Sequence, residues 1–261
     1  MILYDKPAGI TSHDAVALVR RSLGHGVKVG HAGTLDPFAT GLLLVLVGQA
    51  TRVQRFLMAL PKTYETTARF GAVSDTGDPE GQVVQTGVLP EGDLVLPTGR
   101  LRQRPPAYSA VKVGGRRAYE IARSGEPVEL AEREIEVTRF EELWRSGDRR
   151  GFAIECASGT YVRTLISELG DAYCEQLRRT RIGGFDVDAA DPARTIPLGE
   201  ALGFLPETRL DADAAQRAAH GVAVPGRAHG TVRLTDAEGL IALAEPVPGE
   251  DLLKPIVGFR G

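Results

Sequence analysis

Several residue types are scarce in this 261-residue chain, and each scarcity excludes a class of protein. The chain has only two cysteines, 156 and 174, and they do not form a CxxC pair, which excludes a disulfide scaffold. No uncharged stretch approaches the roughly 18 residues that a membrane span requires. The first residues show no basic segment followed by an apolar one, as a secretory signal would. We therefore expect a cytoplasmic protein with reduced, buried cysteines and no membrane segment.

The motifs of several enzyme classes are missing as well. The chain contains no GxxxxGK[ST] phosphate loop, no HExxH zinc helix and no GxSxG nucleophile elbow. Its five histidines show no ligand spacing, so we expect neither a metal nor a cofactor. Asp75, Asp78 and Glu80 share one turn, but they lack the alternating pattern of a calcium loop. This acidic turn is expected to be solvated.

Lysine is scarce too, with 5 lysines against 26 arginines among the 31 basic residues, and the net charge is −3. A pI near 6.0 is not the usual footprint of a nucleic-acid-binding protein. The charge is segregated, however. Between residues 100 and 123 seven basic residues oppose one acid, whereas from residue 186 onward twelve acids outnumber seven bases. The positive stretch is interleaved with Tyr108 and Tyr119, which favours binding to phosphates and bases.

The apolar pattern predicts both helices and strands. Apolar residues at helical spacing between residues 15 and 23 predict a helix that is capped by Thr11 or Ser12 and ends at Gly24. A continuous apolar run over 42–47 predicts a strand buried on both faces. After about residue 207, short apolar stretches separated by Gly, Pro and Asp predict a small β domain. The other expected elements are a short helix over 51–60, strands over 64–70, 135–140 and 152–156, and a helix over 164–177 that is interrupted or bent at Gly170.

The most unusual local feature is Asp36. It precedes Pro37, which restricts it to an extended backbone, and its loop is bounded by glycines that allow a close approach to a ligand. A lone aspartate in a loop is more often a turn former than a catalyst. Two features favour the second interpretation here, because His31 lies on the same loop and basic segments flank it.

Five blocks of sequence carry a resemblance to one family. Residues 30–43, GHAGTLDPFATGLL, resemble the GHxGTLDPxATGLL signature of the bacterial TruB family, the tRNA pseudouridine-55 synthases. Four more blocks resemble the family's motifs in the same order: residues 5–12 resemble DKPxGxTS, residues 62–65 the start of KxYxxxxxLG, residues 105–112 PPxYSAxK, and residues 158–165 GTYIRTL. Five ordered blocks between residue 5 and about 182 argue against chance similarity.

This resemblance implies a chemistry and the residues that perform it. A uridine in the T-loop of tRNA would be isomerised, with cleavage of its N1–C1′ bond and formation of a C5–C1′ bond, without cofactor or metal. Asp36 matches the family's catalytic aspartate, and Arg163 matches the arginine that pairs with it. Tyr64 matches the aromatic residue that lies against the target base, where it would stack and is a candidate to assist removal of the C5 proton. The carboxylate could act as a covalent nucleophile or promote a glycal route, and the sequence does not distinguish these.

The resemblance also implies the residues that bind the substrate. Tyr161 and Leu177 match the family's base pocket, and His31 matches a residue that helps to hold the T-loop open. Lys112 and Arg116 lie in the positive stretch, which aligns with a thumb-like insertion that closes over RNA.

The expected architecture is an α/β (α+β) pseudouridine-synthase fold, with a central, mostly antiparallel mixed sheet flanked by helices. This catalytic domain would span residues 1–206, with the thumb-like insertion at about 100–128, and a short PUA-like domain would span 207–261. We expect a monomer that binds the T-arm of tRNA and no membrane. Two other functions were considered. A non-catalytic tRNA-binding or RNA-folding protein would not need an Asp–Arg pair, and a glycosidase or nucleoside hydrolase would need a second carboxylate or a metal.

Overall fold

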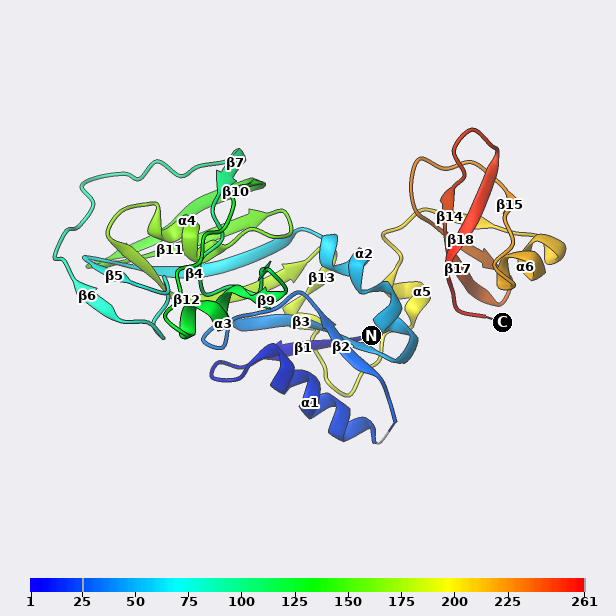
Figure 1. The fold of residues 1–261 in the computed structure, drawn as a ribbon, viewed down its shortest axis with the longest axis horizontal. Helices are drawn as coiled ribbons and strands as arrows, with labels where there is room; N and C mark the ends of the chain where they lie inside the picture. Colours follow the sequence, from blue (N-terminus) through cyan, green and yellow to red (C-terminus); the bar gives the residue numbers. More distant parts are fainter. Residues whose placement is uncertain (25, 261) are drawn as a thin grey trace.

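The computed structural model describes residues 1–24 and 26–260 and consists of two lobes joined by a short connection (Figure 1). A nine-stranded sheet forms the larger lobe, and a five-stranded sheet forms the smaller C-terminal lobe. The lobes touch, because Leu243 and Val257 of the small sheet belong to the same buried cluster as Leu44 and Leu46 of the large one. Among the described residues, no helix is long and apolar enough to cross a membrane.

The large sheet has the strand order β1-β3-β12-β4-β11-β10-β7, with β2 paired to β3 and β13 to β12. Every pairing is antiparallel except that between β3 and β12, so the expected mixed, mostly antiparallel sheet is confirmed. The strands of this sheet are β1 (Ile2–Lys6), β2 (Val29–Ala32), β3 (Thr40–Val47), β4 (Lys62–Phe70), β7 (Gly99–Gln103), β10 (Arg133–Ser146), β11 (Arg149–Cys156), β12 (Ala172–Ile182) and β13 (Phe185–Asp186).

Short helices flank this sheet. Helix α1 begins after a capping box in which Thr11 and Asp14 exchange hydrogen bonds, and Gly24 follows its last residue. The predicted first helix is thus confirmed, with Thr11 as its cap. The region of the expected helix over 51–60 is a six-residue 3₁₀ helix followed by a six-residue α-helix. The helical elements of the large lobe are α1 (Ser12–Leu23), η1 (Gly48–Val53), α2 (Gln54–Ala59), α4 (Val162–Ser167), η2 (Val187–Ala189) and α5 (Leu198–Ala201).

Strand β3 pairs with β1, β2 and β12 and confirms the prediction of a strand buried on both faces. Its residues Leu42, Leu43 and Leu44 are completely buried. Gly41 permits its parallel pairing with β12, because a Cβ atom there would lie 2.2 Å from the carbonyl oxygen of Arg179. The backbone at Gly41 also has a φ of +102°. Only glycine fits this position, and it lets the loop before β3 lie against β12.

The prediction of a helix over 164–177, interrupted or bent at Gly170, is wrong for the residues after Gly170, which form a strand. Helix α4 ends at Ser167, Gly170 has a φ of +136°, and the chain then enters strand β12 at Ala172. Cys174 and Leu177 pair with Ala68 and Thr66 of β4. A strand between two partner strands is stabilised by ladders on both sides, and this tertiary pairing overrides the local helical spacing.

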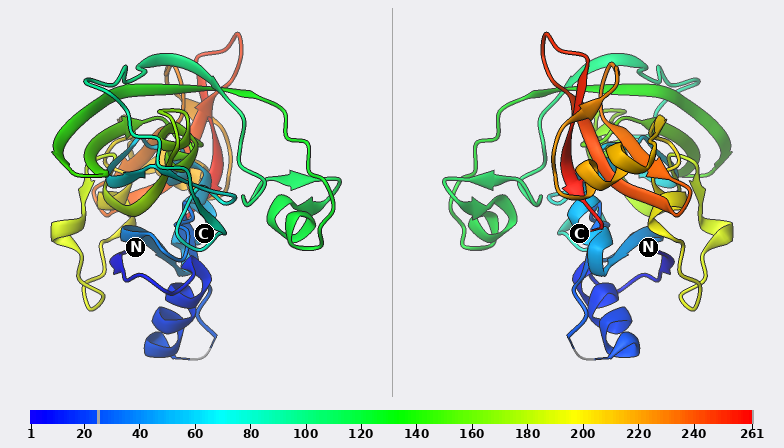
Figure 2. Two further views of the ribbon diagram at one scale, coloured as in Figure 1. Left: turned by 90° about the vertical axis from the view of Figure 1, so that its left-hand side faces the viewer. Right: turned by 90° about the vertical axis from the view of Figure 1, so that its right-hand side faces the viewer.

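The segment between β7 and β10 projects from the large lobe as an arm (Figure 2, green). It contains β8 (Lys112–Val113), β9 (Arg116–Arg117) and α3 (Ala118–Arg123), which form a two-stranded hairpin and a short helix. Two further short strands, β5 (Ala72–Ser74) and β6 (Val83–Gln85), pair with each other beside the acidic turn. The arm is the part of the predicted thumb-like insertion that lies outside the main sheet, since β7 pairs with β10.

The C-terminal lobe is a small β structure with its own apolar core, consistent with the expected PUA-like domain. Its sheet has the order β14-β16-β17-β18-β15, and α6 packs against it through Ala215 and Ala218. The boundary expected near residue 207 remains a prediction. The elements of this lobe are β14 (Glu207–Arg209), α6 (Ala212–Ala219), β15 (Val224–Pro225), β16 (Val232–Asp236), β17 (Gly239–Pro246) and β18 (Leu252–Gly258).

Candidate active site

A cavity of about 260 Å³ lies where the loop before β3 meets strands β4 and β12 and the segment that leads into α4. Five residues singled out from the sequence line it, although they are far apart in the chain: Asp36, Tyr64, Tyr161, Arg163 and Leu177. The cavity is therefore built from the main sheet and two of its loops. His31, Lys112 and Arg116 do not line it.

Asp36 is placed by a loop that is held on both sides. On one side, the hydroxyl of Ser12 accepts a hydrogen bond from the backbone N–H of Leu35 and donates one to its carbonyl. On the other, the buried Lys6 donates from Nζ to the carbonyl oxygen of Pro37 at 3.2 Å. Leu35 itself is buried in the main core. The backbone of Asp36 is therefore fixed, and its carboxylate lies at the edge of the cavity.

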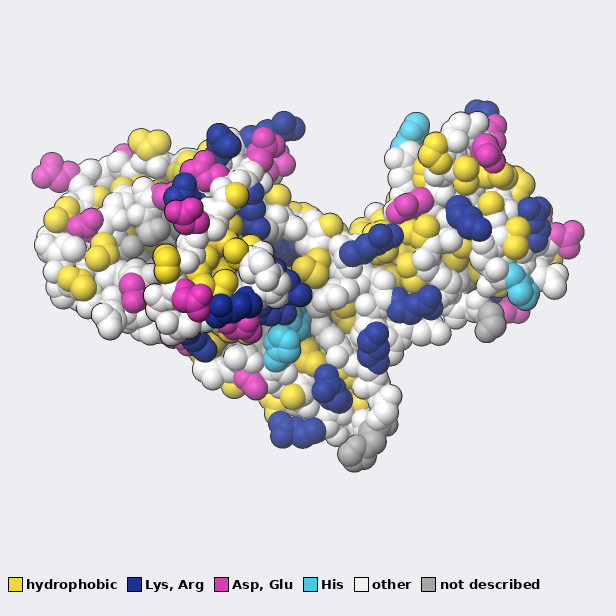
Figure 3. Space-filling view, in the orientation of Figure 1, with side chains coloured by type: hydrophobic (Ala, Val, Ile, Leu, Met, Phe, Trp, Pro, Cys, Tyr) yellow, Lys and Arg dark blue, Asp and Glu magenta, His cyan; other side chains and the backbone are white. Residues whose placement is uncertain are grey.

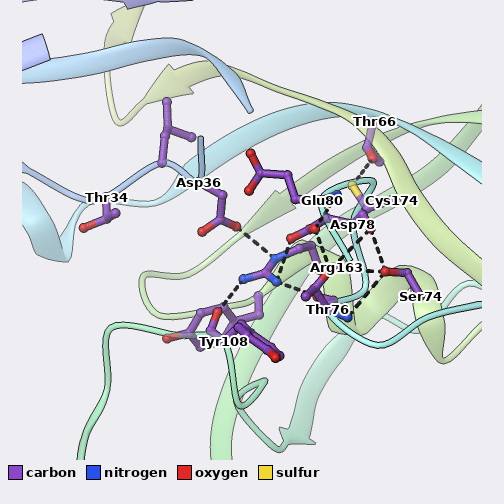
Figure 4. A network of polar contacts seen from close by, with 12 residues as sticks. Thr34, Asp36, Thr66, Ser74, Thr76, Asp78, Glu80, Tyr108, Arg163 and Cys174 are labelled. Carbon is purple, nitrogen blue, oxygen red and sulfur yellow. Dashed lines mark hydrogen bonds and ion pairs between the residues drawn. The ribbon is translucent and has the colours of Figure 1, made fainter. Parts of the chain in front are cut away.

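Arg163, the second residue of α4, is the hub of the polar network in Figure 4. Its side chain is only 3% exposed, and its Nε lies 2.9 Å from Oδ2 of Asp36. Nη1 lies 2.9 Å from Oδ2 of Asp78 and donates to the carbonyl of Thr76, while Nη2 donates to the carbonyl of Tyr108. Four of the five guanidinium N–H donors are therefore used, which fixes the arginine in one orientation.

Asp78 is a site residue that the sequence analysis missed. The turn that contains it was expected to be solvated, but Asp78 is only 4% exposed and forms an ion pair with Arg163. Its Oδ1 accepts hydrogen bonds from Thr76 Oγ1 at 2.6 Å and from the N–H of Glu80 at 3.1 Å. Asp75 and Glu80 of the same turn are exposed, as expected. Arg163, the partner of Asp78, is 85 residues away in the sequence, so no local pattern indicates this contact.

The environment of Asp36 disfavours its charged form. Burial raises the pKa of the Asp36 carboxyl, the charge of Arg163 opposes this shift, and the neighbouring charge of Asp78 adds to it. The side chain still has 34% of its surface exposed, so one part of it faces the cavity while Arg163 binds the other. A carboxylate with a raised pKa is a stronger base and nucleophile than one in water.

Tyr64 and Leu177 form an apolar part of the cavity wall. Both are more than nine-tenths buried, on the adjacent strands β4 and β12. Burial raises the pKa of the Tyr64 phenol, and Arg179 partly opposes that shift. The phenol is therefore neutral at physiological pH, which suits packing against a base better than accepting a proton.

Tyr161 is held in place by its backbone. Its N–H donates to Oε1 of Gln103 at 2.8 Å, and its carbonyl accepts from Nε2 of the same residue at 3.0 Å. The guanidinium of Arg133 lies 4.8 Å from the centre of the Tyr161 ring. Gln103, which is 1% exposed, is a second residue that the sequence analysis missed.

His31 lies on β2, outside the cavity. Its ring packs edge-to-face against His13 of α1, with ring centroids 5.4 Å apart. Burial, together with the charges of His13 and Arg179, lowers the pKa of His31 to about 4. The imidazole is therefore neutral at pH 7.

Lys112 and Arg116 lie on the exposed β8–β9 hairpin of the arm. Arg116 forms an ion pair with Glu126 at 3.1 Å, in which both side chains are about half exposed. The base of the arm reaches the cavity, because Tyr108 binds Arg163 through its carbonyl and Ser109 lines the cavity. The arm is therefore physically connected to the Asp36–Arg163 pair.

Two buried cations that the sequence analysis did not single out hold the Asp36 loop. Arg179 of β12 is 1% exposed and donates from Nε to the carbonyl of Leu42 at 2.7 Å and from Nη2 to that of Gly33 at 3.0 Å. Lys6 is fully buried and binds backbone carbonyls at both ends of its own turn. Within residues 1–24 and 26–260, no group of three or more His, Cys, Asp or Glu side chains is arranged to hold a metal ion.

Comparison with known proteins places this arrangement in a class. The solved structure of a Cbf5–Nop10–Gar1 complex contains a chain with a TM-score of 0.70 and 26% identity, covering all of this chain and 83% of that one. Residues 20–162 match the description "TruB family pseudouridylate synthase (N terminal domain)". The fold and the site therefore define a pseudouridylate synthase, an isomerase of RNA nucleotides.

Curated relatives narrow the class to one family. The tRNA pseudouridine synthase B of Thermobifida fusca (strain YX) is 40% identical over 292 residues, covering 100% of this chain and 98% of that protein. The protein of the same name from Mycobacterium tuberculosis (strain ATCC 25618 / H37Rv) is 40% identical over 271 residues, covering 92% and 89%. The chain belongs to the TruB family, as the sequence motifs predict.

Proposed function

We propose that this protein isomerises uridine 55 in the T-arm of tRNA to pseudouridine. The observation that carries the proposal is the single cavity carboxylate, Asp36, which Arg163 binds at 2.9 Å beside the apolar wall of Tyr64 and Leu177. The names of its TruB relatives support tRNA as the RNA substrate. The position within the tRNA rests on the family resemblance of the motif around Asp36.

The proposed chemistry requires one positioned carboxylate and no water. The N1–C1′ bond of the target uridine breaks, the uracil turns over, and C5 bonds to C1′, with loss of the C5 proton and gain of a proton at N1. Asp36 acts at C1′, at C6 of the base or by promoting a glycal, and Arg163 orients it in each case. Tyr64 lines the cavity and packs against the base. Because burial raises the pKa of its phenol, Tyr64 stays neutral and does not accept the C5 proton.

The target nucleotide must leave the T-loop to reach Asp36. Turning a base out of a folded RNA costs roughly a few kcal/mol. Tyr161 and Leu177 contact the flipped base inside the cavity in this proposal. His31 lies outside the cavity on β2, and its neutral ring fills the space that the base leaves in the loop. A charged imidazole would be poorly suited to pack among bases.

RNA binding is assigned mainly to the exposed arm. Lys112 and Arg116 bind phosphates of the T-arm, and basic side chains also gather around the central hollow and towards the C-terminal lobe in Figure 3. The catalytic domain spans residues 1–206, with the thumb-like insertion at about 100–128, and residues 207–261 form a short PUA-like domain. We propose that the protein acts as a monomer in the cytoplasm, where its tRNA substrate is found.

The other two functions are less well supported. A glycosidase needs a second carboxylate that can reach the scissile bond. Asp78 is a second carboxylate on Arg163, but it is 4% exposed and does not line the cavity. A pure RNA-binding protein has no need of a carboxylate held at the edge of a base-sized cavity.

The test is release of tritium from [5-³H]uridine-labelled tRNA by the wild-type protein and by Asp36→Asn. We expect stoichiometric release by the wild type and none by the variant, which keeps the size and hydrogen-bonding shape of the side chain. A tRNA with cytidine at position 55 is the control for position, and it should release no tritium from that site. Equal release by the two proteins, or none by the wild type on a folded tRNA, would overturn the assignment.

A further inference from the structure

The wall of the active-site cavity carries more positive than negative charge. Lys62, Arg163 and Arg179 line it, against the single acid Asp36. Arg163 is balanced by two carboxylates, those of Asp36 and Asp78. Lys62 and Arg179 have no such balance. Within residues 1–24 and 26–260, neither forms an ion pair with a carboxylate, and their hydrogen bonds go to backbone carbonyls.

Arg179 and Lys62 each have more hydrogen-bond donors than backbone partners. Arg179 is 1% exposed, and three of its five N–H groups point to the carbonyls of Leu42, Thr34 and Gly33. Lys62 is 6% exposed, and two of its three donors point to the carbonyls of Met58 and Leu60. A fourth N–H group of Arg179 faces the hydroxyl of Tyr64. One N–H group of Arg179 and one of Lys62 are therefore left for a ligand in the cavity.

The sheet places these two cations beside the predicted position of the base. Lys62 and Tyr64 are two residues apart on β4, so their side chains lie on the same face of the sheet. Leu177 and Arg179 have the same relation on β12, and Arg179 pairs with Tyr64 across the two strands. One face of β4 and β12 therefore carries both pairs, the apolar Tyr64 and Leu177 and the cationic Lys62 and Arg179.

Keeping two unbalanced cations in this place is costly. A buried charge without an opposite charge loses its hydration, and carbonyl dipoles return only part of that loss. The two groups also repel each other. This repulsion and the burial of Lys62 together lower the pKa of Lys62 to about 8. An anion inside the cavity would offset both costs.

We propose that Lys62 and Arg179 bind the carbonyl oxygens of the target uracil and stabilise the negative charge that the base acquires when its glycosidic bond breaks. This inference rests on the proposed function. When the N1–C1′ bond breaks, its electron pair goes to the uracil ring and spreads over N1, O2 and O4. The pair is returned when C5 bonds to C1′, the C5 proton leaves and N1 is protonated. Lys62 and Arg179 donate hydrogen bonds to the base throughout and transfer no proton.

The test compares two T-arm RNAs that carry uridine or 5-fluorouridine at the target position. Fluorine withdraws electrons, so 5-fluorouracil carries negative charge more easily and depends less on nearby cations. The variant is Lys62→Met, because Arg179 also holds the Asp36 loop. The measured event is the single-turnover disappearance of the target N-nucleoside, read by mass spectrometry of nuclease digests. RNA affinity and thermal melting are measured in parallel.

We expect Lys62→Met to slow the loss of uridine by about 10²-fold, the usual effect of removing one donor to a developing charge. The loss on the 5-fluorouridine RNA should be clearly smaller, the RNA affinity unchanged, and Lys62→Arg should restore most of the rate. Arg150→Met is the matched control. Like Lys62, Arg150 is a buried cation that binds backbone carbonyls, and it also forms an ion pair with Glu142 at 3.4 Å. It does not line the cavity, so its removal should affect both RNAs equally.

The outcomes separate the inference from the proposed function. Wild-type protein that leaves the uridine RNA unchanged contradicts the proposed function itself. Wild-type activity with an equal loss on both RNAs in Lys62→Met shows a purely structural lysine and overturns the inference. Weaker binding with an unchanged single-turnover rate shows a phosphate contact and overturns it as well.

Discussion

The cavity and the arm are both rich in arginine, but they use it in opposite ways. In the cavity, Arg163 and Asp78 form an ion pair whose side chains are 3% and 6% exposed. In the arm, the pair of Arg116 and Glu126 has side chains that are 52% and 53% exposed. Buried charges are fixed in position and feel one another strongly, whereas exposed charges are screened and mobile. Chemistry therefore belongs to the first region, and attraction of a polyanion to the second.

The difference has an energetic side. Removing one partner of a buried ion pair typically costs about 3–5 kcal/mol, because the other charge is left uncompensated. An exposed pair is worth about 0–1 kcal/mol. Substitutions in the cavity should accordingly change stability and catalytic rate, and substitutions in the arm should change RNA affinity and its salt dependence.

The largest expected effect is that of Asp78→Asn. It leaves Arg163 with Asp36 as its one carboxylate, so the loss should be smaller than that for a fully uncompensated charge. The free energy of unfolding should fall by about 1–3 kcal/mol, the cost of disturbing buried hydrogen-bonding groups. Thermal melting measures the loss, and single-turnover pseudouridine formation should fall with it because Arg163 is no longer fixed. The control is Glu80→Gln in the same turn, which is exposed and should melt like the wild type. Melting of Asp78→Asn at the wild-type temperature would show that the pair is not a constraint.

The pH dependence of the single-turnover rate should reflect the ionisation of Lys62. Its pKa is lowered to about 8 by burial and the charge of Arg179, with Cys156 facing it from β11. Burial raises the pKa of Cys156 to about 11, so this thiol supplies no charge in that range. Lys62 is cationic below about pH 8 and loses its charge above it. The single-turnover rate should therefore fall above pH 8 in the wild type. In Lys62→Arg that decline should move to higher pH, and an identical decline in both proteins would exclude Lys62 as its source.

Removing the two cations of the arm should weaken binding rather than chemistry. The double variant Lys112→Ala/Arg116→Ala should bind the T-arm more weakly, and the slope of log K against log salt should decrease by about 1 for each lost phosphate contact. The single-turnover rate at saturating RNA should match the wild type. Arg139→Ala, an exposed arginine on β10 that pairs with Glu141, is the control and should leave the slope unchanged. An unchanged slope in the double variant would remove the arm from the binding surface.

The smallest expected effect is a gain of stability in Asp36→Asn at neutral pH. Because burial raises the folded-state pKa of Asp36, the folded protein holds the proton more tightly than the unfolded chain does. The wild type therefore gains stability as the pH falls through that raised pKa, and at neutral pH its ionised carboxylate is destabilising. The melting temperature of the variant should exceed that of the wild type at pH 7, and the difference should shrink towards pH 4. A variant that melts below the wild type at pH 7 would show that Arg163 outweighs burial.

Local patterns were sufficient for the elements that depend on local interactions. The capping residues Thr11 and Gly24 delimit α1, and the continuous apolar run of β3 predicts its burial on both faces. Strand β12 was not predictable in this way, because it becomes a strand through its pairing with β4 and β3. Spacing alone could not distinguish it from the end of a helix.

The same limit applies to the site. The glycines and Pro37 around Asp36 identify its loop, and the motif resemblance brings Tyr64, Tyr161, Arg163 and Leu177 to one cavity. Arg179 stands in none of the five motif blocks, Asp78 belongs to a turn that was expected to be solvated, and Lys62 begins the block at residues 62–65 without any local sign of burial. They become unusual only when strands and turns distant in the chain bury them together. The net charge of −3 was equally uninformative, because it averages the basic arm with an acidic C-terminal lobe.

The most direct test of the division between cavity and arm is a paired measurement on Asp36→Asn. The dissociation constant for T-arm RNA and the single-turnover yield of pseudouridine are determined on the same preparation. If the cavity performs the chemistry and the arm supplies the affinity, Asp36→Asn should bind the RNA with a dissociation constant close to the wild-type value and form no pseudouridine. Pseudouridine formed at the wild-type rate, or a yield restored simply by raising the RNA concentration, would contradict the central role of Asp36.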